Sequence, residues 1–139
     1  MNALQEPPRP VTLPVSDWLR VDAVLDNEAS CDADDDRLAE MALRIRETGW
    51  AQLPDWPTEP ARFAAWPHPG QTVTVTPTPP QWTLTLTALN RWAHVADRAA
   101  SRDSYLDAHR LQTIATKISQ QLHAPGADQQ AREEDRCRK

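Results

Sequence analysis

Apolar residues recur at helical spacing over residues 35–48, and they predict the clearest helix of the chain. The apolar positions are Leu38, Met41, Ala42 and Ile45. They follow the i, i+3, i+4, i+7 spacing of a helix that buries one face. Acidic residues at the start and arginines near the end suit the helix dipole. Gly49 stands where a left-handed residue commonly follows a helix, so we expect the helix to end there.

Residues 16–26 fit two patterns. In a helix, Ser16 would cap the N-terminus, and four apolar side chains would share one face: Trp18, Val21, Val24 and Leu25. In a strand, apolar residues would alternate with polar ones from Leu19 to Leu25, but Val24 interrupts that alternation. The pattern favours the helix, and the strand is the alternative.

Two runs of alternating residues predict a β-hairpin. Residues 72–76 alternate threonine with valine, and residues 82–87 alternate threonine with leucine after an initial tryptophan. A four-residue proline-rich loop between them places the two valines opposite Trp82 and Leu84. One face of the hairpin is then threonine and the other is apolar. A shift by one residue would mix the faces, so the pattern itself supports this register.

Residues 88–123 have a helical pattern with two apolar stripes. The polar run 101–104 breaks the phase between the stripes, which predicts two helices with a tight connection. One bent helix is the alternative. A short helical turn is expected at residues 58–66, within a connection rich in proline and aromatic residues.

These elements predict an α+β fold, a small single domain of about four helices and a two-stranded antiparallel β-hairpin with flexible N- and C-terminal tails. The length of 139 residues suits one ordinary domain. Residues 1–14 form a proline-rich extended arm that we expect to add little to the core. Residues 15–124 form the domain, and residues 125–139 form a charged disordered tail. The predicted core is Leu38, Met41, Ile45, Trp50, Val73, Val75, Trp82, Leu84, Leu89, Trp92, Leu111, Ile114, Ile118 and Leu122.

Charge is unevenly spread along the chain, which has a net charge of −5. Residues 16–36 hold eight acidic residues against Arg20 alone, and the rest of the chain is slightly basic. The basic footprint of a nucleic-acid-binding protein is not seen over the whole chain. The acidic segment therefore predicts a surface that docks on a basic protein. The alternative is a solvated acidic loop that helps to start a helix.

Six tryptophans accompany one tyrosine and one phenylalanine. We expect most of them in the core, where a small domain needs their bulk. Trp56 and Trp66 lie in the proline-rich connection, where such rings often anchor an interface. The candidate partner-binding residues are therefore Asp26, Glu28, Asp32, Asp34, Asp35, Asp36, Trp56 and Trp66.

The sequence contains no recognisable catalytic or metal-binding motif. Residues 32–36 fit the first half of a calcium loop, but Arg37 replaces the glycine of the turn and Leu43 replaces the bidentate glutamate. The four histidines lack metal-ligand spacing, and phosphate-binding loops and nucleophile elbows are absent. Cys31 and Cys137 are expected to be free thiols. We therefore expect no enzymatic activity, no cofactor and no metal.

The leading hypothesis is a non-enzymatic protein-interaction module in the cytoplasm. In its specific form, it is an acidic inhibitor from a phage or mobile element that docks on a basic surface of a nucleic-acid-handling protein. No apolar run is long enough for a membrane span, and no secretory signal is expected.

Two alternatives use other parts of the chain. Residues 88–123 could form a helical nucleic-acid-binding or regulatory module, and the self-assembly alternative predicts a homodimer completed at the apolar sheet face or the helical pair. Acidic residues dilute the basic ones in residues 88–123, which ranks the first alternative below the leading hypothesis. Its candidate phosphate contacts are Arg91, Arg98, Arg102, Arg110 and Lys117.

Overall fold

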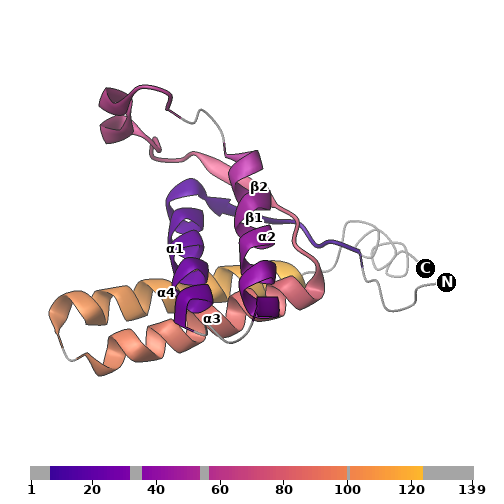
Figure 1. The fold of residues 1–139 in the computed structure, drawn as a ribbon. Coiled ribbons are helices and arrows are strands. Elements are labelled where there is room, and N and C mark those ends of the chain that lie inside the picture. The colour runs from indigo at the N-terminus through magenta and orange to yellow at the C-terminus, as the bar shows by residue number, and fades with distance from the viewer. Residues whose placement is uncertain (1–6, 32–35, 54–56, 100, 124–139) are drawn as a thin grey trace, which may run out of the picture.

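The structure, a computed structural model, describes residues 7–31, 36–53, 57–99 and 101–123. α3 and α4 run side by side, α1 and α2 stand across them, and the two strands pack against α1 and α2 (Figure 1). The predicted α+β class, with four helices and a two-stranded antiparallel sheet, is confirmed. The elements are β1 (Val11–Pro14), α1 (Val15–Cys31), α2 (Asp36–Gln52), a 3-10 helix (Pro60–Ala65), β2 (Thr72–Val75), α3 (Pro79–Arg98) and α4 (Arg102–His123).

The sheet pairs β1 with β2, two segments that are far apart in the sequence. In this antiparallel register, Val11 lies opposite Val75 and Leu13 lies opposite Val73. The predicted strand at residues 72–76 is therefore present, but its predicted partner is wrong. Residues 82–87 lie in α3 instead.

α3 begins earlier than predicted because the sequence around Thr78 is a strong helix start. The Gln81 N–H donates to the Thr78 hydroxyl at 3.4 Å, and the Thr78 N–H donates to the Gln81 side chain at 2.9 Å. Within this capping box, Pro79 occupies the first helical position, where it lacks the N–H that a first turn leaves unpaired. Within the helix, the Thr85 hydroxyl donates to the Gln81 carbonyl at 2.9 Å. The alternating threonines of residues 82–87 therefore belong to a helix and do not form a sheet face.

Part of the N-terminal arm belongs to the core. Val11 and Leu13 are 1% and 0% exposed, so the expectation that this arm adds little to the core is wrong for β1. Thr12 faces outward between them, and its hydroxyl lies 2.7 Å from that of Thr74. Pro14 is the last residue of the strand and lies opposite Thr72, and the next backbone hydrogen bond between the two segments runs from the Val15 N–H to the Gln71 carbonyl at 2.9 Å.

The helix interpretation of residues 16–26 is confirmed, because α1 spans Val15–Cys31. The predicted helix end at Gly49 is wrong, because α2 continues to Gln52. Gly49 faces the indole of Trp18, and a Cβ at this position would collide with the ring. The glycine therefore permits the close approach of α1 and α2, and it does not form a left-handed turn.

The prediction of two helices in residues 88–123 is confirmed. The Ser104 N–H donates to the Ser101 hydroxyl at 3.1 Å, which satisfies an otherwise unpaired donor at the start of α4. The helical turn expected at residues 58–66 is the 3-10 helix. The prediction of a disordered tail at residues 125–139 and the first six residues of the predicted arm lie outside the described residues.

Most of the predicted core is buried. Trp50 is the exception at 44% exposed, because α2 continues past Gly49 and its period turns position 50 outward. The buried members are Ile45, Val73, Val75, Trp82, Leu89, Leu111, Ile114 and Ile118. The half-buried members at the edge of the core are Leu38, Met41, Leu84, Trp92 and Leu122.

Candidate protein-interaction site

Four acidic residues of the segment 16–36 form ion pairs with bases that lie outside that segment. Because those bases belong to α2, α3 and α4, the pairs attach α1 to the three other helices. The acidic residues on α1 therefore contribute to the packing of the helices. The pairs are Asp17–Lys117, Asp22–Arg46, Asp26–Arg46 and Glu28–Arg91, with N–O distances of 2.8, 2.9, 3.1 and 2.9 Å.

Glu28 is buried, with 5% of its surface exposed. One carboxylate oxygen accepts from Arg91 at 2.9 Å and the other accepts from the Trp92 indole N–H at 2.8 Å. Both oxygens thus hold α1 against α3. We therefore leave Glu28 out of the surface that we propose for a partner.

Replacing Glu28 by Ala is expected to lower the free energy of unfolding by about 2 kcal/mol, because the Trp92 N–H loses its buried acceptor. Asp26→Asn is the matched control. Asp26 pairs with Arg46 at an exposed position, where such a pair contributes less than about 1 kcal/mol. Urea denaturation measures both changes. Equal midpoints for the two variants would contradict the structural role of Glu28.

The three other predicted site residues that the structure describes do not form one cluster. Asp26 and Asp36 are exposed, on α1 and at the first turn of α2. Trp66 is half-buried and packs against the core, in the connection that follows the opposite end of α2. The remaining predicted members, Asp32, Asp34, Asp35 and Trp56, lie outside the described residues.

The outward face of α2 carries a regular stripe that alternates carboxylates with apolar side chains. Its members are Asp36, Glu40, Leu43, Glu47 and Trp50, all exposed. Successive members are four, three, four and three residues apart, so they lie along one side of the helix. Leu43 and Trp50 are 46% and 44% exposed. We call this set the α2 stripe.

Arg46 holds the edge of the α2 stripe in place. Its guanidinium lies 4.9 Å from the centre of the Trp50 ring, within the range of a cation–π contact. The same side chain bonds Asp22 and Asp26 of α1. The hydrogen bond that Arg46 donates to the Asp22 carboxylate raises the pKa of Arg46, so the stacked group stays charged. Trp50 is therefore an ordered, half-exposed ring beside a fixed charge, which reduces the entropy cost of using it as an anchor.

Sequence reasoning identified Asp36 but not the rest of the α2 stripe. The signal was present as the 4-3-4-3 spacing of residues 36–50 on the polar side of the helix. Because the sequence analysis assigns Trp50 to the core, this residue is not counted with the exposed side of the helix, and the spacing is missed. The ion pairs of α1 have no comparable signal, because their bases lie at distant positions in the chain.

A second group of exposed apolar side chains lies where α3 meets α4. Val95, Tyr105 and Leu106 are 49%, 63% and 56% exposed. We call this end of the two helices the α3–α4 tip, which extends past α1 (Figure 1). A groove of about 250 Å³ separates α1 from the tip. Its lining is Arg20, Ala23, Val24, Asn27, Trp92, Val95, Ala96, Asp107 and Leu111.

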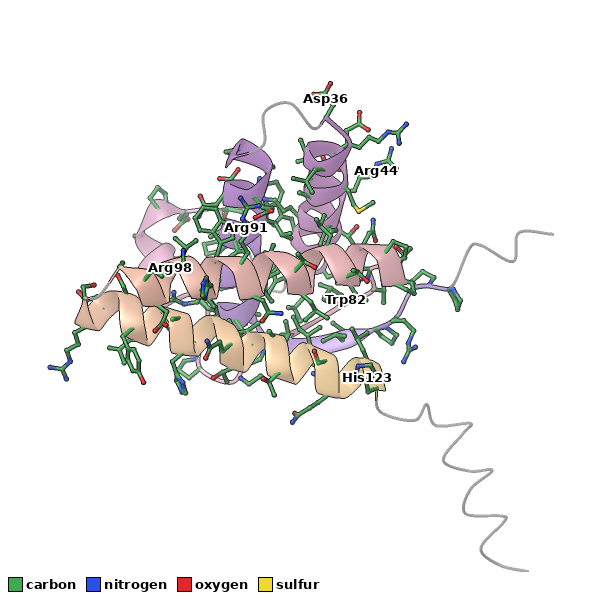
Figure 2. The ribbon with its side chains drawn as sticks, turned by 90° about the horizontal axis from the view of Figure 1, so that it is seen from below. Asp36, Arg44, Trp82, Arg91, Arg98 and His123 are labelled. Carbon is green, nitrogen blue, oxygen red and sulfur yellow. The ribbon has the colours of Figure 1, made fainter. Side chains whose placement is uncertain are left out.

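The two halves of the fold differ in charge. Residues 15–53 contain ten acidic and four basic residues, a net charge of −6, whereas residues 79–123 contain three and five, a net charge of +2. Figure 2 shows Asp36 and Arg44 at the α1–α2 end, away from α4, and Arg98 on α3 near the tip. Arg44 borders the α2 stripe, which therefore has a basic neighbour on one side.

The described residues bring no cluster of metal-ligating side chains together. Among them, no group of three or more His, Cys, Asp or Glu side chains is placed to hold a metal ion. A hollow of about 590 Å³ beside the 3-10 helix is lined by Arg62, Trp66 and His68 together with small residues, and no carboxylate of a described residue lines it. Within the described residues, no helix has both the length and the apolar character to cross a bilayer.

Comparisons with family models, with curated proteins and with solved structures found no match to this chain.

Proposed function

We propose that this protein is a non-enzymatic protein-interaction module that docks through the α2 stripe on a basic surface of a partner protein. The observation that carries the proposal is the α2 stripe itself, where Leu43 and Trp50 alternate with three exposed carboxylates. Isolated exposed apolar residues are ordinary on protein surfaces. On α2, however, two large apolar side chains lie on the same side of the helix as three carboxylates. Grouped exposed apolar side chains bordered by polar ones are typical of a protein-interaction surface.

The two kinds of side chain have separate roles. Burial of Leu43 and Trp50 against a partner supplies affinity, with each side chain contributing about 2 kcal/mol. The carboxylates of Asp36, Glu40 and Glu47 alternate with these anchors along one side of α2. They favour a basic partner, raise the association rate and make binding sensitive to salt.

In its specific form, the proposal is an inhibitor of a nucleic-acid-handling protein, encoded by a phage or mobile element and acting in the cytoplasm. Surfaces that bind nucleic acid are basic because they neutralise phosphates. Three carboxylates along one helix side, next to Asp32, Asp34 and Asp35 in the sequence, carry the charge that such a surface binds. Occupation of that surface would exclude the nucleic acid.

The test is capture of partners from source-cell lysate, followed by measurement of the dissociation constant with the identified protein. Leu43→Ala with Trp50→Ala should weaken binding by at least about 30-fold, because both anchors are lost. Val95→Ala with Leu106→Ala is the matched control, because it removes equally exposed apolar side chains at the α3–α4 tip. The control should retain its partner. Equal affinity of the two double variants would overturn the proposal.

A further inference from the structure

We propose that the outer edge of β2 pairs with the same edge of a second copy, so that two two-stranded sheets join into one antiparallel sheet in the order β1-β2-β2-β1. The contact uses residues 72–76 and no residue of the α2 stripe. It therefore adds a second interaction surface to the proposed function and does not depend on it.

The outer edge of β1 is already occupied by a side chain of α4. The Thr12 N–H donates to the Gln121 side-chain oxygen at 2.8 Å, and the Gln121 side-chain N–H donates to the Thr12 carbonyl at 2.7 Å. The amide of one glutamine thus takes the place of a neighbouring strand. An edge with unpaired backbone groups invites another strand, so this bond pair protects β1 from such pairing.

The outer edge of β2 has no comparable cover. Alternate residues of an antiparallel strand direct their N–H and carbonyl groups to opposite sides. Val73 and Val75 direct theirs toward β1, and Thr72, Thr74 and Thr76 direct theirs away from it. Within the described part of the chain, no residue forms a hydrogen bond with these outward backbone groups. This edge lies on the side of the sheet away from α3 and α4 (Figure 1).

The residues of this edge favour strand pairing. Natural edge strands often carry charged side chains, proline or a bulge, which block the addition of another strand. Residues 72–76 consist of threonine and valine only, and both residue types favour strands. The three threonines are exposed. A sheet of two strands is also smaller than most sheets, and further strands stabilise it.

The order of these residues indicates that the added strand is a second copy of β2. The run Thr72-Val73-Thr74-Val75-Thr76 reads the same in both directions. When two such runs pair antiparallel with Thr74 opposite Thr74, every threonine lies opposite a threonine and every valine lies opposite a valine. The three outward threonines of each copy then exchange backbone hydrogen bonds, two at each of the three facing pairs. A shift by two residues would leave only two facing pairs.

This register keeps each side of the combined sheet uniform. The valines of both copies face the side that each copy already covers with its own α1 and α2. The threonines of both copies face the other side, where cross-strand threonine pairs stabilise a sheet. A shift by one residue would turn the valines of one copy away from its helices, so the burial pattern also supports this register.

The association stops at two copies. Because the same edge contacts the same edge, the contact has two-fold symmetry and occupies β2 in both copies. The edges that remain belong to β1, where Gln121 already bonds Thr12. The contact consists mainly of backbone hydrogen bonds and buries little apolar surface, so we expect a weak dimer that forms at high protein concentration.

Sedimentation equilibrium on the full chain, from roughly 10 μM to 1 mM, measures the association. Wild type should approach twice the chain mass at high concentration and should not exceed it. Thr74→Pro removes an outward N–H and places a ring at the edge, so this variant should associate at least about tenfold more weakly. Circular dichroism before each run shows whether the variant is folded.

Charged variants test the register. Thr74→Lys and Thr74→Glu each place like charges opposite one another in their own dimers, so each variant alone should associate about threefold more weakly than wild type. An equal mixture should gain mass at lower concentration than either variant alone, because lysine then faces glutamate. Thr12→Lys is the matched control. It loses the same hydroxyl contact with Thr74 but lies on β1, so it should dimerise as wild type does.

Amide hydrogen exchange locates the contact on the chain. The Thr74 N–H should exchange more slowly at the high protein concentration than at the low one, because the second copy then accepts its hydrogen bond. An exchange rate of Thr74 that does not change while the mass doubles would place the dimer contact on another surface and would overturn the inference.

Three other results would also overturn it. They are a wild type that stays monomeric at every concentration, a folded Thr74→Pro that dimerises as wild type does, and a mixture of the two charged variants that associates no better than either alone. A monomeric wild type counts against the second copy even if an extended segment of another protein adds to β2. If Thr74→Pro does not fold, the mixture of charged variants and the exchange of Thr74 in wild type decide.

Discussion

Replacing Leu13 by Ala is expected to lower the free energy of unfolding by about 3 kcal/mol. The side chain is fully buried in β1, opposite Val73 of β2. Truncation removes apolar surface from the core and leaves a cavity that neighbouring side chains fill only in part. Denaturation by urea, followed by circular dichroism, measures the loss as a lower midpoint at constant slope.

Thr12→Ala is the matched control, because Thr12 is the exposed neighbour in the same strand. It loses only a hydroxyl contact with Thr74 on the outer face of the sheet, so its free energy of unfolding should fall by less than about 1 kcal/mol. If Leu13→Ala and Thr12→Ala unfold at the same urea concentration, β1 does not form part of the core in solution.

The sequence predicts best where structure is local. The helix at residues 35–48, the helix at residues 16–26 and the break near residues 101–104 all depend on apolar spacing within a few turns. The pairing of β1 with β2 depends on residues about 60 positions apart, and no local pattern specifies it. The alternation of Val11, Thr12 and Leu13 is visible in the sequence, but three residues between prolines are a weak strand signal.

The wrong strand at residues 82–87 has a different cause. The alternation of threonine and leucine in residues 82–87 favours a strand by itself. In α3 the buried positions are instead Trp82, Thr85 and Leu89, at helical spacing, and Leu84 and Leu86 are half-buried. The deciding signal is the run Thr78-Pro79-Pro80-Gln81, which matches a capping box with proline in the first turn. Helix-start chemistry prevails over strand propensity here because α3 continues for 20 residues against the core.

The sequence predicts only those features of the candidate site that depend on neighbouring residues. Acidic residues near the start of α2 are evident in the sequence, and Asp36 is exposed as expected. The internal use of Glu28 is not predictable, since Arg91 and Trp92 reach it from a distant helix. Charge counts along a sequence thus overstate surface acidity wherever the fold supplies bases from elsewhere.

Replacing Gly49 by Ala is expected to lower the free energy of unfolding, although alanine ordinarily stabilises a helix more than glycine does. Helix propensity alone would make Ala about 1 kcal/mol better than Gly at this interior position. The new Cβ would instead collide with the buried indole of Trp18. Overpacking against a ring with no exposed surface forces α1 and α2 apart, and we expect a net loss of about 3 kcal/mol in the free energy of unfolding.

Two further variants identify the cause of the loss. Glu47→Ala, at an exposed position of the same helix, should change the free energy of unfolding by less than about 0.5 kcal/mol. Adding Trp18→Phe to Gly49→Ala removes part of the ring that the Cβ meets, so the losses of the two single variants should sum to more than the loss of the pair. The Trp18 indole N–H has no hydrogen-bond partner in the described structure, so this replacement breaks no bond there. Strict additivity would show that Gly49 and Trp18 are not in contact, and a stabilising Gly49→Ala would show that α1 and α2 lie further apart.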